Sequence, residues 1–299
     1  MTHPLTERPD GLSFLAGLIG SGIGPSLTPP MHEREAAELG RRLDYRTIDI
    51  DVLGAAPEDV GRLMRSARRL GFDGLNITHP CKQLILPHLD DLTPDATALG
   101  AVNTVVLDGP GATGHNTDWS AFARALETGL PDAPRGRVLL LGSGGAGSAV
   151  GYALMRAGTG ELVVSDPDTD RAERLADNLG HRFPDRVCRA VPASQVAGTV
   201  QVSDGLVNAS PVGMAHHPGT PLAPELLRPP LWVADVVYRP LNTELLLAAR
   251  AHGCRTLSGK GMAVHQAAEA FHLITGMVPD RDRMLAHFDQ LERAGAPAG

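Results

Sequence analysis

The first third of the chain alternates short apolar runs with longer segments in which apolar residues recur every three or four positions. The runs predict buried strands and the longer segments predict amphipathic helices. The expected strands lie at 14–20, 45–53, 74–78 and 102–108, and the expected helices lie at 30–43, at 56–72 and after Thr93-Pro94. Such an alternation of strand and helix predicts an α/β layer with a mainly parallel sheet.

A second block with the same rhythm begins near Arg137. Its expected strands lie at 138–141, 161–166, 205–210 and 232–238, with helices at 148–155 and 169–179. This is the pattern of a doubly wound fold. Between the blocks, residues 120–136 have the pattern of a helix that ends in a Pro/Gly hinge, and the chain after Gly261 is helical with no strand signal. We therefore expect two α/β domains, 1–118 and 119–262, with 263–299 packing back on the first.

Length and charge narrow the class of protein. At 299 residues the chain is longer than a single core usually supports, so two domains of ordinary size are expected. Hydrophobic residues make up 42%, charged residues make up 20%, and the formal net charge is -7. This balance describes a globular protein with a mildly acidic surface and argues against nucleic acid as a partner.

The cysteines and the apolar segments exclude further classes. Cys81, Cys188 and Cys254 are widely spaced and contain no C-x-x-C pair, so neither a disulfide framework nor a metal site is expected. No apolar stretch approaches the roughly 20 residues of a membrane span. The apolar run near the N-terminus follows Glu7 and Asp10 instead of a basic leader, which disfavours a signal peptide. We expect a cytoplasmic protein without a membrane partner.

A glycine-rich turn opens the second block. Gly142, Gly144, Gly145 and Gly147 stand between a buried strand and a helix, where glycines let the backbone approach a pyrophosphate at a helix N-terminus. The next strand ends in Asp166, a carboxylate suited to accept hydrogen bonds from ribose hydroxyls and to repel a 2′-phosphate. The pattern favours NAD and leaves NADP possible. The alternative is a tight turn without a ligand.

The cation of that region is Arg171, which lies between Asp168 and Asp170. It is included in the expected cofactor site.

Lysine is nearly absent from the chain, where Lys82 and Lys260 are the only two. An ammonium group can lose its proton when its surroundings depress its pKa, whereas a guanidinium cannot. Lys82 is therefore a candidate general acid or base, and Asp118 offers a carboxylate that could hold it by a charge-assisted hydrogen bond. The alternative is a solvated lysine at the start of a helix over 81–89, after Pro80.

Seven segments then resemble, in order, the motifs of the shikimate dehydrogenase family, over about residues 17–279. They are NITHPCK at 76–82, GAVNT at 100–104, GHNTD at 114–118, GSGGAG at 142–147, VNASPVGM at 207–214, DVVYRPLNTELL at 235–246 and GKGMAVHQAAEAF at 259–271. The resemblance implies a substrate-binding N-terminal domain, a Rossmann-like nucleotide-binding domain, and reversible hydride transfer between a ring hydroxyl and a nicotinamide.

The resemblance also implies roles for individual residues. Lys82 and Asp118 correspond to the catalytic pair of the family. The positions that correspond to substrate-binding residues are Ser26, Thr28, Asn76, Thr78, Asn103 and Gln266. The positions that correspond to cofactor-binding residues are Gly142, Gly144, Gly145, Ala146, Gly147, Asp166, Arg171, Asn208, Ser210, Val236 and Gly261.

Two departures from the biosynthetic pattern bear on the substrate and the cofactor. Ser26-Leu27-Thr28 stands in place of S-x-S, and SDPDTDRA at 165–172 stands in place of an N-R-T type sequence. Both resemble the NAD-dependent quinate/shikimate dehydrogenase branch. The alternatives are an NADP-dependent biosynthetic shikimate dehydrogenase, an aminoshikimate dehydrogenase, and a nucleotide-binding sensor without turnover. The expected partner is a small-molecule substrate, and the expected state is a monomer or homodimer.

Overall fold

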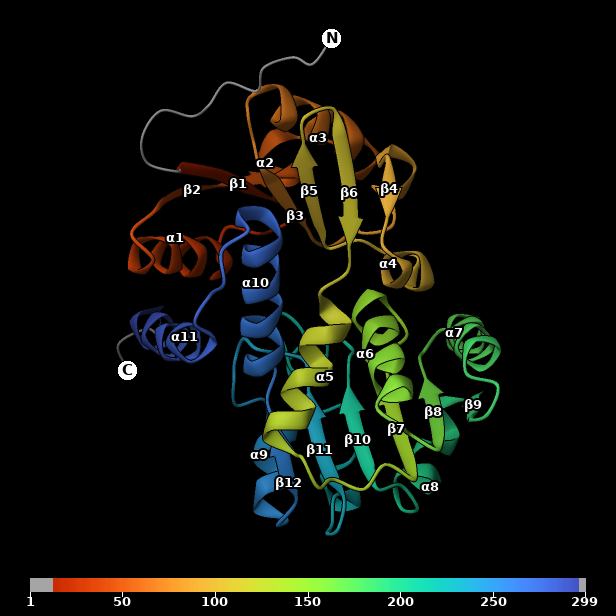
Figure 1. Cartoon of the computed structure of the whole chain (residues 1–299). Coiled ribbons are helices and arrows are strands. Elements are labelled where there is room, and N and C mark those ends of the chain that lie inside the picture. The colour runs from red at the N-terminus through yellow and green to blue at the C-terminus, as the bar shows by residue number, and fades with distance from the viewer. Residues whose placement is uncertain (1–12, 296–299) are drawn as a thin grey trace. The chain divides into compact units, whose positions relative to one another are not determined.

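The computed structural model describes residues 13–295, which belong to two compact units (Figure 1). Unit 1 comprises 1–117 and 267–299, and unit 2 comprises 118–266. Each unit has helices packed on one six-stranded sheet, so the α/β class expected from the pattern of apolar runs is confirmed. No helix within residues 13–295 combines the length and the apolar composition that crossing a bilayer requires.

The sheet of unit 1 has the order β2-β1-β3-β5-β6-β4. Its strands are β1 (Ser13–Gly20), β2 (Arg42–Asp49), β3 (Gly74–Ile77), β4 (Asp91–Leu92), β5 (Thr104–Asp108) and β6 (Gly111–His115). β1 is parallel to β2 and β3, but β5 is antiparallel to both β3 and β6. The sheet is therefore mixed and less parallel than expected. Strand β6 was not predicted because its five residues, GATGH, contain two glycines and only one β-branched residue, Thr113.

The helices of unit 1 flank these strands. They are α1 (Thr28–Glu38), α2 (Ile50–Leu53), α3 (Val60–Arg69), α4 (Pro94–Leu99), α11 (Arg281–Gly295) and the C-terminal part of α10 (Lys260–Thr275), with the 3-10 turns η1 (Pro57–Asp59) and η2 (Leu86–His88). The helix start expected at Thr93-Pro94 is confirmed, because the Thr93 side chain accepts a hydrogen bond from Ala96 N–H and caps α4.

Some expected elements of unit 1 differ from the structure. The helix expected over 30–43 ends at Glu38, and β2 already begins at Arg42. The strand expected over 45–53 ends at Asp49, because the Asp49 carboxylate accepts a hydrogen bond from Asp51 N–H and starts α2. The helix expected over 81–89 does not form, and those residues instead make consecutive turns that end in η2.

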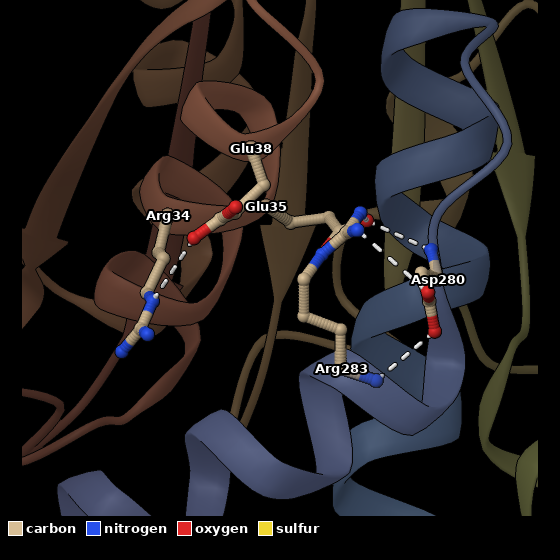
Figure 2. Close-up of polar contacts among 5 residues, drawn as sticks. All are labelled: Arg34, Glu35, Glu38, Asp280 and Arg283. Carbon is tan, nitrogen blue, oxygen red and sulfur yellow. Dashed lines mark hydrogen bonds and ion pairs between the residues drawn. The ribbon is translucent and has the colours of Figure 1, made fainter.

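An ion pair with a buried carboxylate joins α11 to α1 (Figure 2). Glu35 on α1 is 2% exposed, and its carboxylate accepts hydrogen bonds from Arg283 Nε at 2.9 Å and from Asp280 N–H at 2.7 Å. A second Arg283 nitrogen, Nη2, pairs with the same carboxylate at 2.5 Å. A buried carboxylate is tolerated when it is paired and hydrogen-bonded in this way. The pair fixes the C-terminal helix on the helix that begins at Thr28.

The sheet of unit 2 is entirely parallel, with the order β12-β11-β10-β7-β8-β9. Its strands are β7 (Arg137–Leu141), β8 (Glu161–Ser165), β9 (Val187–Ala190), β10 (Gly205–Asn208), β11 (Trp232–Asp235) and β12 (Arg255–Leu257). Read from β9 to β12 this is the doubly wound order 3-2-1-4-5-6, in which the order of successive strands across the sheet reverses between β7 and β10. Ligands of such sheets bind beyond the carboxyl ends of the strands at that reversal.

Helices connect the strands of unit 2 and cover the sheet. They are α5 (Asp118–Gly129), α6 (Gly145–Arg156), α7 (Thr169–Arg182), α8 (Val196–Val200), α9 (Glu244–Ala251) and the first part of α10, with the 3-10 turns η3 (Ala193–Gln195) and η4 (Pro224–Leu226). Figure 1 shows α5 and α6 side by side on one face of the sheet. The glycine-rich segment identified in the sequence forms the turn between β7 and the start of α6.

Candidate active site

The glycine turn of unit 2 requires glycine at two positions. Gly142 has φ +97°, a conformation that side chains disfavour, and a Cβ at this residue would lie 2.8 Å from the backbone of Ala209. A Cβ at Gly147 would lie 2.0 Å from the Gly142 carbonyl oxygen. The strand, the turn and helix α6 thus pack too closely for any other residue. Such a turn exposes backbone N–H groups at a helix N-terminus, which is the arrangement that binds a phosphate.

Asp166 follows β8 next to this turn and has a fixed orientation. Its carboxylate accepts hydrogen bonds from Ser143 N–H at 2.7 Å, from Ser143 Oγ at 2.8 Å and from Asp168 N–H at 3.0 Å. Burial alone would raise the pKa of Asp166, but these hydrogen bonds and the charge of Arg171 outweigh it and lower that pKa. The Arg171 guanidinium itself lies 3.4 Å from the place of a Gly144 Cβ.

These residues fit a dinucleotide. The glycines let the turn pack tightly at the N-terminus of α6, where backbone N–H groups could bind a pyrophosphate. Asp166 presents an ionised carboxylate at the end of the second strand, where a ribose hydroxyl would be recognised. Ser143 was not among the expected site residues, because the G-S-G pattern gives no sign that its side chain would turn back to Asp166.

The other expected cofactor residues lie at the ends of β10 and β11 and at the start of α10. Asn208 is 0% exposed, and its side chain donates to Val212 O at 2.9 Å and accepts from Ser210 Oγ at 2.6 Å. Its amide therefore shapes the loop over 208–213. Val236 N–H donates to Asn208 O at 3.0 Å. At Gly261 a Cβ would lie 2.9 Å from Ala125 Cβ, so this glycine allows α10 to approach α5.

Unit 1 holds a buried network of neutral polar side chains across β2, β3 and β5. Tyr45 Oη donates to Asn76 Oδ1 at 2.7 Å, and Asn76 Nδ2 donates to Thr104 Oγ1 at 3.0 Å. Asn103 Nδ2 donates to Thr117 Oγ1 at 2.9 Å, while Thr117 N–H donates back to Asn103 Oδ1 at 2.8 Å. Thr104 Oγ1 closes the network with a donation to Asn103 Oδ1 at 3.3 Å.

This network brings together two of the expected substrate residues, Asn76 and Asn103, which are 6% and 2% exposed. The Asn76 amide is occupied within the protein, since its Nδ2 also donates to Asn103 O at 3.3 Å. Tyr45, Thr104 and Thr117 were not among the expected site residues. A sequence gives no signal that a tyrosine on one strand will meet an amide 31 residues later.

Lys82 lies in the turns that follow β3, and its carbonyl accepts a hydrogen bond from Val102 N–H at 2.9 Å. Its backbone is thereby tied to the residue before Asn103. The side chain is partly exposed. Its neighbours in sequence differ, because Cys81 is fully buried in the core whereas His79 is exposed.

The loop after β1 carries the expected carboxylate cradle. The Asp49 side chain accepts hydrogen bonds from Gly22 N–H at 3.2 Å and Ile23 N–H at 2.9 Å, which fixes the start of this loop. At its end, Thr28 N–H donates to Ser26 Oγ at 3.3 Å.

The remaining expected residues lie on separate elements. Thr78 N–H donates to Ile19 O at 2.9 Å, which holds Thr78 against β1. Asp118 is 5% exposed and is the first residue of α5, and Gln266 lies on α10. Within residues 13–295, no three His, Cys, Asp or Glu side chains lie close enough together to hold a metal ion.

Two family models match the chain. The shikimate dehydrogenase substrate binding domain matches residues 18–105, and the shikimate 5′-dehydrogenase C-terminal domain matches residues 259–287.

Full-length relatives agree with these matches. The NADP(+) shikimate dehydrogenase of Streptomyces avermitilis is 58% identical over 96% of this chain and 98% of its own length. The NAD(+) quinate/shikimate dehydrogenase of Corynebacterium glutamicum is 50% identical over 92% of this chain and 98% of its own length.

A solved structure extends the likeness to the fold. Quinate dehydrogenase from Corynebacterium glutamicum in complex with NAD superimposes with a TM-score of 0.88 and 49% identity, over 93% of this chain and 99% of that one. The similarity therefore spans nearly the whole length of the proteins compared.

Proposed function

Because the chain belongs to the shikimate dehydrogenase family of nicotinamide-dependent oxidoreductases, we propose that it oxidises a ring hydroxyl of quinate and shikimate with NAD. The observation that carries the choice of NAD is Asp166, whose carboxylate is held by Ser143 beside the glycine turn. An ionised carboxylate at this position attracts ribose hydroxyls and repels a 2′-phosphate.

The proposed chemistry assigns proton transfer to Lys82. When bound, a nicotinamide accepts hydride from the carbon that bears the hydroxyl group. The hydroxyl proton must leave at the same time, so a base must contact that oxygen. Lys82 takes this proton, which leaves a ketone, and returns it in the reverse reaction. Asp118 supplies a second catalytic group, a carboxylate that accepts a hydrogen bond from a neighbouring ring hydroxyl, which makes a misplaced ring costly.

The substrate contacts are proposed from unit 1. Ser26 and Thr28 donate hydroxyl hydrogen bonds to the substrate carboxylate. Asn103 and Thr78 contact ring hydroxyls. Gln266, the last residue of unit 2, is proposed as a substrate residue on α10. Asn76 supports this set through its hydrogen bonds to Thr104 and Tyr45.

An NADP-dependent biosynthetic shikimate dehydrogenase is the second candidate. It is favoured by the 58% identity to the Streptomyces avermitilis enzyme and by Arg171, a cation beside the turn that could meet a 2′-phosphate. An aminoshikimate dehydrogenase differs only in the ring substituent that the substrate site accepts.

An activity panel tests these candidates. The full chain is assayed with NAD and with NADP, each against quinate, shikimate and an amino-substituted shikimate, by the absorbance of the reduced nicotinamide. We expect the highest kcat/KM with NAD and either quinate or shikimate. A higher kcat/KM with NADP would support the biosynthetic candidate, and preference for the amino compound would support the third. Cofactor binding by calorimetry without turnover on any substrate would indicate a sensor.

A further inference from the structure

Asp235, the last residue of β11, is a buried carboxylate whose three hydrogen-bond donors are all neutral. It is 2% exposed. Its Oδ1 accepts from Asn208 Nδ2 and from Val237 N–H, both at 3.0 Å, and its Oδ2 accepts from Thr243 Oγ1 at 2.7 Å. Burial raises the pKa of Asp235, and the three hydrogen bonds oppose that shift in part. Keeping such a group is costly, so a neutral residue would serve better if only packing were needed.

The three donors come from separate segments at the carboxyl edge of the sheet. Asn208 ends β10 and, through Val212 O and Ser210, shapes the loop over 208–213. Val237 lies in the chain after β11, next to Val236. Thr243 caps α9 by accepting a hydrogen bond from Leu246 N–H at 3.3 Å. One carboxylate thus holds three segments that line one edge of the doubly wound sheet.

A carboxylate does this better than its amide counterpart. It has acceptors only, so both oxygens can receive donors from different directions. An asparagine at this position would turn an NH₂ group toward either Thr243 Oγ1 or the Asn208 and Val237 N–H groups. In the first arrangement the Thr243 hydroxyl would have to accept a hydrogen bond instead of donating one. In the second, the new NH₂ group would face the N–H groups of Asn208 and Val237 with no acceptor between them.

The position of these segments suggests which part of a ligand they serve. In a doubly wound sheet, each half of the strands binds one mononucleotide of a dinucleotide. Asp166 and the glycine turn belong to the half formed by β7, β8 and β9, whereas Asp235 belongs to the half formed by β10, β11 and β12. We propose that Asp235 is a positioning residue that holds the 208–213 loop and the backbone at Val236 in the shape required by the nicotinamide half of the cofactor. This inference rests on the proposed function.

The test compares Asp235→Asn with Asp204→Asn in the full chain. Asp204 precedes β10 at the opposite, amino edge of the same sheet, where its carboxylate accepts a hydrogen bond from Arg137 N–H at 2.8 Å. Both substitutions replace a carboxylate that binds backbone, but only Asp235 lies at the proposed cofactor edge. Binding of NAD and of ADP, which lacks the nicotinamide, is measured by calorimetry, with the melting temperature as a check of folding.

We expect Asp235→Asn to raise the Kd for NAD by about tenfold or more, as for the loss of a buried charge-assisted hydrogen bond, and to leave the Kd for ADP within about twofold. Asp204→Asn should leave both Kd values close to wild type. Equal weakening of NAD and ADP binding by Asp235→Asn, or unchanged NAD binding, would overturn the inference.

A milder variant keeps the test decisive if Asp235→Asn fails to fold. Thr243→Val removes one donor to Asp235 Oδ2 and should weaken NAD more than ADP, by a smaller factor. If it leaves the ratio of the two Kd values unchanged, the inference is wrong. Failure of the proposed function looks different, because it appears in the wild-type chain itself, as absent turnover or as a higher kcat/KM with NADP.

Discussion

The candidate sites of the two units are built from different groups, side chains in unit 1 and mainly backbone in unit 2. In unit 1, neutral side chains from three strands hold one another, from Tyr45 through Asn76 and Thr104 to Asn103 and Thr117. In unit 2, a backbone turn provides the cradle and carboxylates fix its surroundings, with Asp166 held by Ser143 at one side. A dinucleotide offers phosphates that backbone N–H groups can bind. A polyhydroxylated ring offers only hydroxyl groups and a carboxylate, so its site depends on side chains in fixed positions.

This difference predicts how substitutions in each unit affect cofactor binding and substrate use. A substitution that distorts the backbone turn should weaken cofactor binding strongly, because no side chain can replace backbone N–H groups that no longer reach the phosphates. Damage to one member of the side-chain network should weaken substrate use moderately, because the other hydrogen bonds remain.

The largest effect on cofactor binding is expected for Gly147→Ala. The new Cβ would lie 2.0 Å from the Gly142 carbonyl, so the turn must shift. We expect unfolding to become easier by about 1–3 kcal/mol, as in other overpacked sites, and NAD affinity to fall by at least about tenfold, by chemical unfolding and calorimetry. Gly180→Ala on α7 is the control, since nothing lies within 4 Å of the new Cβ. NAD binding at wild-type strength in Gly147→Ala would contradict the account of the turn.

Unit 1 is expected to lose stability at acidic pH, because its interior contains a buried neutral histidine. His32 on α1 is fully buried between the rings of Tyr45 and Phe271, and neither ring nitrogen has a hydrogen-bond partner of normal geometry. Burial, offset only in part by the Ala267 backbone, lowers the pKa of His32 to about 3 from its ordinary value of 6.5.

The sign of this effect follows from proton binding. Below pH 6.5 the unfolded chain binds a proton that the folded chain refuses, so the stability due to neutral His32 is full above pH 6.5 and is lost as the pH falls toward 3. At about pH 5 the loss is about 2 kcal/mol. Urea unfolding of His32→Leu at about pH 7.5 and pH 5 should lack this loss, whereas His216→Leu, at an exposed position, should keep it. Equal losses in wild type and His32→Leu would exclude the buried histidine as the cause.

A smaller effect is expected for Asp166→Ala. Without the carboxylate, the ribose loses an acceptor and a 2′-phosphate is no longer repelled, so the ratio of kcat/KM for NAD over NADP should fall by about tenfold. Asp170→Ala, at an exposed position of α7, is the matched control and should keep the ratio. If Asp166→Ala also keeps the ratio, the ribose is recognised elsewhere.

The smallest effect is expected for Tyr45→Phe. The change removes one hydroxyl and leaves Asn76 Oδ1 without its donor, at a cost of about 1 kcal/mol or more. We expect kcat/KM for the substrate to fall by about fivefold while NAD binding stays unchanged. Tyr152→Phe makes the same change in unit 2, where the hydroxyl contacts Arg156, and should not affect substrate use. An equal fall in both variants would remove the network from the account.

The same comparison explains what the sequence could predict. The glycine turn and Asp166 were predictable because both depend on residues close in sequence to a strand end. The buried strands of unit 2 were also predictable from local sequence, since β7 and β8 are continuous apolar runs.

The rest depends on contacts across the fold. Strand β6 forms because it pairs with β5, although its own residues do not favour a strand. Tyr45 and Asp235 acquire their partners through the strand order, which local patterns do not encode. The helix expected over 81–89 is replaced by turns, while the Lys82 carbonyl accepts a hydrogen bond from the distant Val102 N–H. Pattern and propensity therefore identified the backbone cradle and missed most of the supporting side chains.

The central claim is that Lys82 transfers the proton while unit 2 holds the cofactor. The most direct measurement is the turnover of Lys82→Met at saturating substrate, together with calorimetric binding of NAD and of the substrate. We predict that turnover falls by about 10²–10⁴-fold, with NAD affinity unchanged and substrate affinity changed only modestly. Turnover at the wild-type rate in this variant would contradict the claim.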